Sequence, residues 1–184
     1  MAQQFPELSP RLVEFITRQP MFFVATAARE GRVNVSPKGY DSLRVLGPNR
    51  LIWLNLTGSG NETAGHLLDS PRMTLMSCSF DRQPLILRVY GTAVGVNAGE
   101  PGWDELCGQL PDEPGARTIF DLTIDLVQTS CGYAVPELAV IGERPLLRTW
   151  AGKKGPGGIA EYWRERNRTT IDGAPTGIPV DGPP

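Results

Sequence analysis

The chain has 184 residues, of which 40% are hydrophobic and 21% charged, a composition typical of a folded domain with its own core. Its formal net charge is −2, so there is no general basic field to attract nucleic acid or an anionic membrane surface. No stretch approaches the roughly 20 apolar residues that cross a bilayer, and the first residues lack the pattern of a signal peptide. We therefore expect neither nucleic acid nor a membrane as a partner.

The residues that commonly ligate metals or form disulfides are few and scattered. Cys78, Cys107 and Cys131 are odd in number and form no C-x-x-C pair, which favours a reducing compartment and excludes a zinc site or a disulfide framework. We expect the cytoplasm. Cys131 is interpreted as a structural thiol in preference to a reactive one. The single histidine, His66, has no carboxylate or cysteine at a useful spacing, so a metal site or a Ser-His-Asp triad is not predicted.

The elements are predicted in chain order from periodicity and turn signals. Ser9 followed by Pro10 predicts a capped helix start, with Leu12, Phe15 and Ile16 on one face. Strands and short helices then alternate with Gly- and Pro-rich turns. The predicted strands cover residues 21–28, 32–39, 43–46, 51–56, 72–80, 85–97 and 118–128, and the predicted short helices cover residues 61–69 and 103–110.

This order of elements favours a mainly β, antiparallel fold. Most strands are joined by hairpin-length turns and no βαβ rhythm exists, so a barrel or sandwich is predicted and a doubly wound sheet is not. In the last fifty residues, 159–168 fit a charged helix. From residue 172 the chain is rich in Pro and Gly, so this tail is expected over the surface, over a dimer partner, or disordered.

The strand around residues 33–39 separates polar from apolar side chains. Alternation puts Val33, Val35 and Pro37 on one face, and it puts an amide, a hydroxyl and an ammonium on the other: Asn34, Ser36 and Lys38. Two interpretations stay open: a solvated outer face, or a polar strip that meets an anionic or heteroaromatic ligand. Pro37 removes one donor from the ladder, as happens where a strand leaves its sheet or meets a ligand.

A Gly-rich loop at residues 57–60 precedes the helix predicted over 61–69. Glycines and a helix N-terminus suit a phosphate, but the spacing matches neither the Walker nor the dinucleotide-binding fingerprint. An ordinary capped helix therefore stays open. In an empty site the Glu62 carboxylate interacts favourably with the helix dipole. It would repel a bound phosphate unless it points away or pairs with a cation.

Three further residues are candidates for ligand contact. Trp53 and Asn55 share a strand face, where a tryptophan is more often core than ligand platform. Arg88 lies within an apolar strand and needs an anionic partner or an exit to solvent. An ion pair and a ligand contact are both open for Arg88.

The ordered set of these segments resembles the pyridoxamine 5′-phosphate oxidase-like flavin-binding superfamily. The resemblance covers about residues 12–128. It is carried by the opening strand pair (residues 22–27 and 32–39) and the next core strand (51–56). It is also carried by the phosphate-loop helix (60–67) with the strand after it (70–76), and by a long strand with a glycine break (87–93).

The resemblance implies a mainly β (α+β) antiparallel split β-barrel with short flanking helices, working as a homodimer with FMN at the subunit interface and a small-molecule substrate. It implies an N-terminal helix in residues 1–20, an FMN-binding barrel in 21–130 and a C-terminal extension in 131–184 that packs on the barrel or the partner. The implied cofactor contacts fall along the flavin ring and ribityl chain, beside the ring, and at the phosphate. They are Ser36, Pro37, Lys38 and Gly39, then Trp53 and Asn55, then Asn61, Glu62 and Thr63. The sequence pattern itself adds Gly60 of the Gly-rich loop and Arg88 as candidate cofactor contacts.

One departure bears on function. Family members that oxidise pyridoxamine 5′-phosphate resemble this chain but place Arg-Lys where it has Glu62 and Thr63, and charge-assisted bonds are about twice as strong as neutral ones. The leading hypothesis is an FMN-dependent oxidoreductase whose substrate the sequence does not identify, with deazaflavin as an alternative cofactor. The alternatives are a non-enzymatic flavin- or haem-binding protein and a degenerate structural or partner-binding dimer with no cofactor.

Overall fold

The computed structural model describes residues 2–179. Within that range, eight strands form one antiparallel sheet in the order β3-β2-β6-β7-β8-β5-β4, with β1 paired to β8. The strands are β1 (Gln3–Phe5), β2 (Phe22–Thr26), β3 (Asn34–Lys38), β4 (Leu43–Gly47), β5 (Arg50–Leu56), β6 (Arg72–Cys78), β7 (Ile86–Asn97) and β8 (Ala116–Ser130). The helices are α1 (Pro10–Arg18), α2 (Glu62–Asp69), α3 (Trp103–Cys107) and α4 (Leu146–Arg166).

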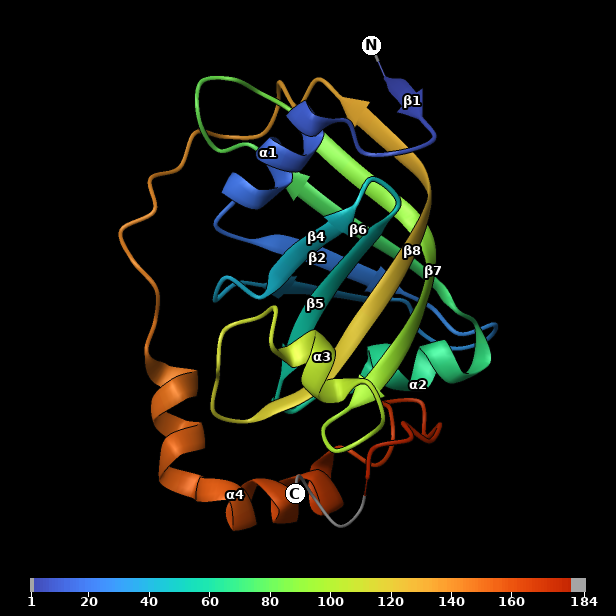
Figure 1. Ribbon diagram of the computed structural model, residues 1–184, viewed down its shortest axis with the longest axis vertical. Coiled ribbons are helices and arrows are strands. Elements are labelled where there is room, and N and C mark those ends of the chain that lie inside the picture. The colour runs from blue at the N-terminus through green and yellow to red at the C-terminus, as the bar shows by residue number, and fades with distance from the viewer. Residues whose placement is uncertain (1, 180–184) are drawn as a thin grey trace.

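The strongly twisted sheet curls into an antiparallel split barrel, so the predicted mainly β class is confirmed (Figure 1). Helix α1 lies with β1 at one end, and α2 and the second half of α4 lie at the other (Figure 1). An extended segment after β8 connects the two ends along one side of the barrel. The C-terminal extension thus returns to the end where the Gly-rich loop opens.

The main core fills the barrel interior. Trp53 is fully buried, stacks on Phe120 at 4.7 Å between ring centroids and meets Phe22 edge-on at 6.2 Å. Most of the remaining core is aliphatic and comes from alternating positions of β2, β5, β6, β7 and β8, as expected for strands with one buried face, and α1 adds Leu12, Phe15 and Ile16. Because apolar side chains fill the interior, the inward-facing polar side chains lie at the ends of the barrel.

A glycine permits the tight crossing of β7 over β8. The register shifts between Tyr90 and Gly91, and a Cβ on Gly91 would overlap the carbonyl oxygen of Thr123. Such an irregularity bends the strand and increases its twist, which the closure of the barrel requires. This is the glycine break singled out in the sequence.

The predicted elements are found with their ends shifted by a few residues, and three features differ. The Ser9 cap is confirmed, since its side chain accepts from the Leu12 N–H. A short strand, β1, precedes α1 and pairs with β8. Its strand conformation depends on this long-range pairing and not on local propensity. Helix α4 is longer than expected and kinks at Gly155, whose φ is 63°. The tail packs on the barrel through Thr176 and Ile178, both buried, and residues 180–184 lie outside the described residues.

Candidate functional site

Strand β3 turns its polar face toward the inside of the barrel. Its direct partners on β2 are Phe22 for Lys38 and Val24 for Ser36, so the polar strip continues the face that carries the core. The apolar side faces outward instead, and Val35 is 61% exposed. The interpretation of the polar strip as a solvated outer face is therefore wrong for this strand.

Lys38 is the largely buried cation of this strip. Its Nζ lies 3.2 Å from Oδ1 of Asn55 and 5.1 Å from the ring centroid of Trp53. Burial and, to a smaller extent, the nearby positive charge of Arg117 lower the pKa of Lys38 from its ordinary 10.5 to about 8, against the opposing effect of Glu62. Among the described residues no carboxylate forms an ion pair with this ammonium, so the ammonium can bind an electron-rich atom of a ligand.

Arg117 underlies the Gly-rich loop that joins β5 to α2. It is the extra residue of a bulge, because Asn55 pairs with Thr118 while Leu56 pairs with Ala116. A bulge re-aims a side chain, and here the guanidinium is 1% exposed and donates to the carbonyl of Gly60 at 3.0 Å. Burial lowers its pKa to about 10, while Glu62 raises it.

The C-terminal extension holds the same loop from the other side. Asn167, fully buried, donates to the carbonyl of Gly58 at 2.9 Å and accepts from Nη1 of Arg117 at 2.8 Å. Trp163, also fully buried, donates its indole N–H to Oγ1 of Thr57 at 2.8 Å. The carbonyl groups of the Gly-rich loop are thus bound by side chains of both the barrel and the extension, which fixes the backbone of the loop.

The predicted phosphate residues stand at the start of α2. Asn61 is the N-cap residue but forms no side-chain cap; its amide donates to the carbonyl of Asn167 at 3.2 Å, and its Oδ1 is buried without a partner among the described atoms. Thr63 is buried and accepts from Asn34 of β3 at 3.3 Å. Glu62 accepts from the Ile171 N–H at 3.2 Å.

The lone histidine is a structural neighbour of this network. Nδ1 of His66 lies 3.1 Å from Oγ1 of Thr26, and the ring is 3% exposed. Among residues 2–179 no cluster of three or more His, Cys, Asp or Glu side chains could hold a metal ion. In the same range, no helix is both long and apolar enough to span a membrane.

Two cavities follow the polar face of β3. The smaller, the lysine pocket, has about 240 Å³ and is lined by Pro37, Lys38, Gly39 and Asn55 together with the Gly-rich loop and Leu147. The larger, the Glu62 groove, has about 700 Å³ and lies between Asn34, Gly60, Glu62 and the extension. Both are open to solvent and both are walled by the C-terminal extension, so this extension is part of the site.

The extension is fastened at both ends of β3. Asp172 accepts from the backbone N–H of Arg32 at 2.8 Å and pairs with its guanidinium. At the other end the guanidinium of Arg148 lies 4.3 Å from the ring centroid of Tyr40 and bonds Glu113 at 2.8 Å. The polar strip lies between these two anchors.

Arg88 does not join this site within one protomer. It shares the outward row of the sheet with Pro37, Phe23 and Met76, and donates to Oγ of Ser130 at 3.0 Å. We call this surface the outer sheet face, defined by the outward rows of β3, β2, β6 and β7: Phe23, Ala25, Val35, Pro37, Thr74, Met76, Arg88 and Tyr90.

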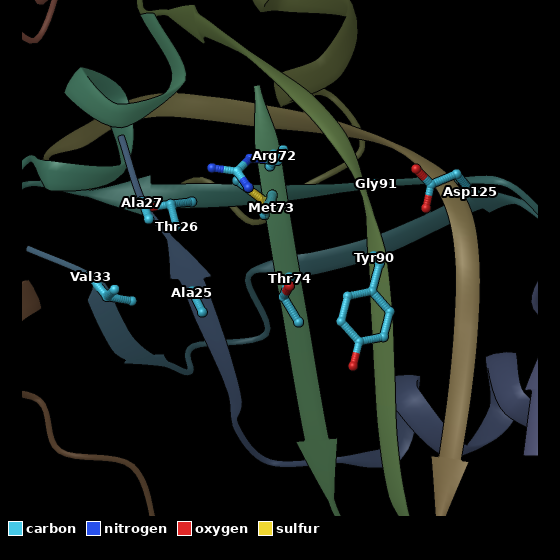
Figure 2. Close-up of a pocket in the computed structure, with 10 residues that line it drawn as sticks. All are labelled: Ala25, Thr26, Ala27, Val33, Arg72, Met73, Thr74, Tyr90, Gly91 and Asp125. Atoms are coloured by element: carbon cyan, nitrogen blue, oxygen red, sulfur yellow. The ribbon is translucent and has the colours of Figure 1, made fainter. Parts of the chain in front are cut away.

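The outer sheet face is hollowed near the Gly91 bulge. Figure 2 shows this hollow, of about 410 Å³, with the Tyr90 ring and Thr74 projecting from β7 and β6, and with Asp125 projecting from β8. Val33, 70% exposed, lines it from the segment before β3 (Figure 2). Of the candidate contacts, Arg88 therefore lies on the outer sheet face, Trp53 lies in the core, and Pro37 belongs to the outward row while also lining the lysine pocket.

Trp53 reaches the site only through Lys38, because the ring itself is fully buried in the core. Asn55 lies two residues further along β5 and is 4% exposed, where the core face meets the lysine pocket. Sequence reasoning missed Arg117, Trp163 and Arg148. The one local signal was an arginine directly before the apolar run of β8.

Comparisons with known proteins agree with this architecture. Residues 8–131 match the model of the pyridoxamine 5′-phosphate oxidase family. A protein of Aspergillus flavus, "Pyridoxamine 5′-phosphate oxidase family protein ustO", is 37% identical over 190 residues, which cover 93% of this chain and 76% of the relative. The chain therefore belongs to the pyridoxamine 5′-phosphate oxidase family.

Solved structures share the fold at low identity. A pyridoxamine 5′-phosphate oxidase candidate from Lactobacillus delbrueckii aligns with a TM-score of 0.53 and 21% identity, covering 67% of this chain and 94% of the other. An FAD-binding protein from Mycobacterium smegmatis aligns with a TM-score of 0.50 and 12% identity, covering 67% and 97%. In both cases about a third of this chain lies outside the alignment.

Proposed function

We propose that this protein is a flavin-dependent oxidoreductase that acts on a small molecule as a homodimer. The observation that carries the proposal is the Lys38 ammonium, which is buried at the polar end of the barrel against an amide oxygen and an aromatic ring and which no described carboxylate bonds directly. A buried cation needs a counter-charge or an electron-rich partner. The N1–O2 edge of a flavin, which gains negative charge on reduction, meets that need.

The residues of β3 and β5 suit this role. Lys38 would stabilise the negative charge of the reduced ring, and Asn55 holds the ammonium in place at 3.2 Å. Ser36 and Asn34 offer hydroxyl and amide groups along the same face. When bound, a flavin supplies the hydride or electron chemistry itself, so the protein needs to bind, orient and shield it. FMN is the flavin that family membership suggests, and a structural neighbour that binds FAD adds support for a flavin.

The homodimer is proposed from two exposed apolar surfaces. The outer sheet face ends at the unpaired edge of β3, where Val33 and Val35 are 70% and 61% exposed. The extended segment after β8 exposes Tyr133, Val140 and Ile141. A sheet edge and apolar side chains left open to solvent are typical of an interface between chains. The three free thiols agree with a cytoplasmic location.

The test is the visible absorption spectrum of the purified protein, with mass spectrometry of any released cofactor. We expect flavin bands near the ring's usual wavelengths, either as purified or after incubation with FMN or riboflavin. Lys38→Met is expected to weaken binding and Lys153→Met, at an exposed lysine of α4, is the charge-matched control. A colourless protein that binds neither flavin would overturn the proposal and favour the degenerate-dimer alternative.

A further inference from the structure

The start of α2 is where the fold would place a phosphate, and in this chain a carboxylate of its own occupies that place. A Cβ on Gly60 would overlap Oε2 of Glu62, so the carboxylate lies against the backbone of the Gly-rich loop. Its other oxygen accepts from the Ile171 N–H at 3.2 Å. Gly60 therefore makes room for Glu62, although a Gly-rich loop is usually taken to make room for a ligand.

The surroundings of Glu62 satisfy a negative charge. Within the described part of the chain no side chain caps α2, and the carboxylate at its first position meets the positive end of the helix dipole. Glu62 also raises the pKa of both buried cations, Lys38 and Arg117, so its negative charge acts on each of them without forming an ion pair. With Glu62 in place, these cations are partly neutralised without a ligand.

The Glu62 groove has no surplus of positive charge for a second anion. Its charged lining residues are Arg32, Arg166, Glu62 and Glu165, two of each sign, and Arg32 is already paired with Asp172. A phosphate dianion here would face the Glu62 carboxylate across the backbone of one glycine. Like charges at such short range disfavour binding strongly when they are partly buried.

We infer that Glu62 is a specificity-determining residue that fills the anion position at α2 and makes the site select a flavin whose tail carries no phosphate, riboflavin over FMN. This inference rests on the proposed flavin-binding function and departs from the FMN that family membership suggests. The groove keeps polar groups for an uncharged polyol tail, namely the side chains of Asn34, Ser59 and Thr170.

The experiment compares the dissociation constants of riboflavin and FMN by quenching of flavin fluorescence, at low and at high salt. The proteins are wild type, Glu62→Gln and Glu161→Gln. Glutamine keeps an acceptor for the Ile171 N–H and removes the charge, and Glu161 is an exposed acid of α4 that does not line the Glu62 groove. Thermal melting checks that each variant is folded.

We expect wild type to bind riboflavin at least about tenfold tighter than FMN at low salt, with the ratio shrinking at high salt. Glu62→Gln should shift the ratio about tenfold or more toward FMN, and Glu161→Gln should leave it unchanged. A wild type that prefers FMN, or a ratio that Glu62→Gln does not move, overturns the inference while the flavin proposal stands. Binding of neither flavin overturns both. If Glu62→Gln does not fold, the wild-type ratio and its salt dependence decide alone.

Discussion

The guanidinium of Arg117 and the side-chain oxygen of Asn167 are joined by a 2.8 Å hydrogen bond between two buried residues, one at the start of β8 and one at the end of α4. Both also bind carbonyl groups of the Gly-rich loop. The loop, the barrel and the C-terminal extension are therefore one unit of structure. The extension is not an appendage to a finished barrel, because Asn167 supplies the donor for the carbonyl groups of Gly58 and Ser59.

The first prediction concerns Asn167→Ala. The change removes the buried Asn167 partner of the Arg117 guanidinium and of the Gly58 carbonyl and leaves between these two only a 3.4 Å hydrogen bond. The loss of two buried hydrogen bonds, one of them to a charged group, costs about 2–4 kcal/mol together. We expect the free energy of unfolding in urea to fall by that amount, with loss of flavin binding. Arg168→Ala, at the exposed next position, is the control. An Asn167→Ala protein as stable as the control would show that the loop stands without the extension.

The second prediction concerns Lys38→Met. The folded-state pKa of Lys38 is about 8 against an ordinary 10.5, so between these values the unfolded chain binds a proton that the folded chain has lost. Stability from this group therefore rises with pH across that window and is lowest below pH 8. We expect Lys38→Met to be more stable than wild type at pH 7 by roughly 1–3 kcal/mol, and the margin to shrink toward zero at pH 10.5.

The measurement is urea unfolding of both proteins at several pH values. Groups other than Lys38 that titrate in this range are common to the two proteins, so the difference isolates this lysine. Lys153→Met, on the exposed part of α4, controls for the change in net charge. A margin that stays constant from pH 7 to 10.5 would mean that the stabilisation comes from packing of the methionine.

The polar strip was predictable because strand alternation is a local property, and Asn34, Ser36 and Lys38 share a face whatever the rest of the fold does. Which way the face points was not predictable, since it depends on pairing with Phe22 and Val24 of β2. Arg117 was missed because its direction comes from a bulge in the β5–β8 register. The contact of Asn167 with Ser59 spans 108 positions, beyond any local pattern.

The third prediction concerns the fastening of the terminal segment, residues 168–178, by Asp172. The Arg32 N–H and guanidinium hold the pKa of Asp172 below its ordinary value of 3.8, so the carboxylate stabilises the segment above that pH and loses this effect as pH falls through the lower folded-state value. We expect Asp172→Asn to speed amide hydrogen exchange in residues 168–178 at pH 7. Below the folded-state pKa the two proteins should exchange alike.

Asp69→Asn is the matched control for this exchange experiment. Asp69 accepts from the Arg29 N–H at 2.6 Å and so fastens the neighbouring turn in the same manner. Its loss should speed exchange in the turn around residues 27–31 and leave the terminal segment unchanged. Equal effects of both substitutions on residues 168–178 would contradict a local role for Asp172.

The fourth prediction concerns Val35→Asp on the outer sheet face. Val35 is 61% exposed at the sheet edge and pairs with Ala25, so a carboxylate there meets no described partner in the protomer and leaves its fold unchanged. In a dimer built on this face the same carboxylate would be buried against apolar side chains, at a cost of several kcal/mol. We expect sedimentation velocity to show a dimeric wild type and a monomeric Val35→Asp with an unchanged circular dichroism spectrum.

Val94→Asp, at a 63% exposed position of β7 beyond the Gly91 bulge, is the control for this experiment and should stay dimeric. A monomeric wild type would contradict the dimer itself, whereas a dimeric Val35→Asp would move the interface to the exposed segment after β8.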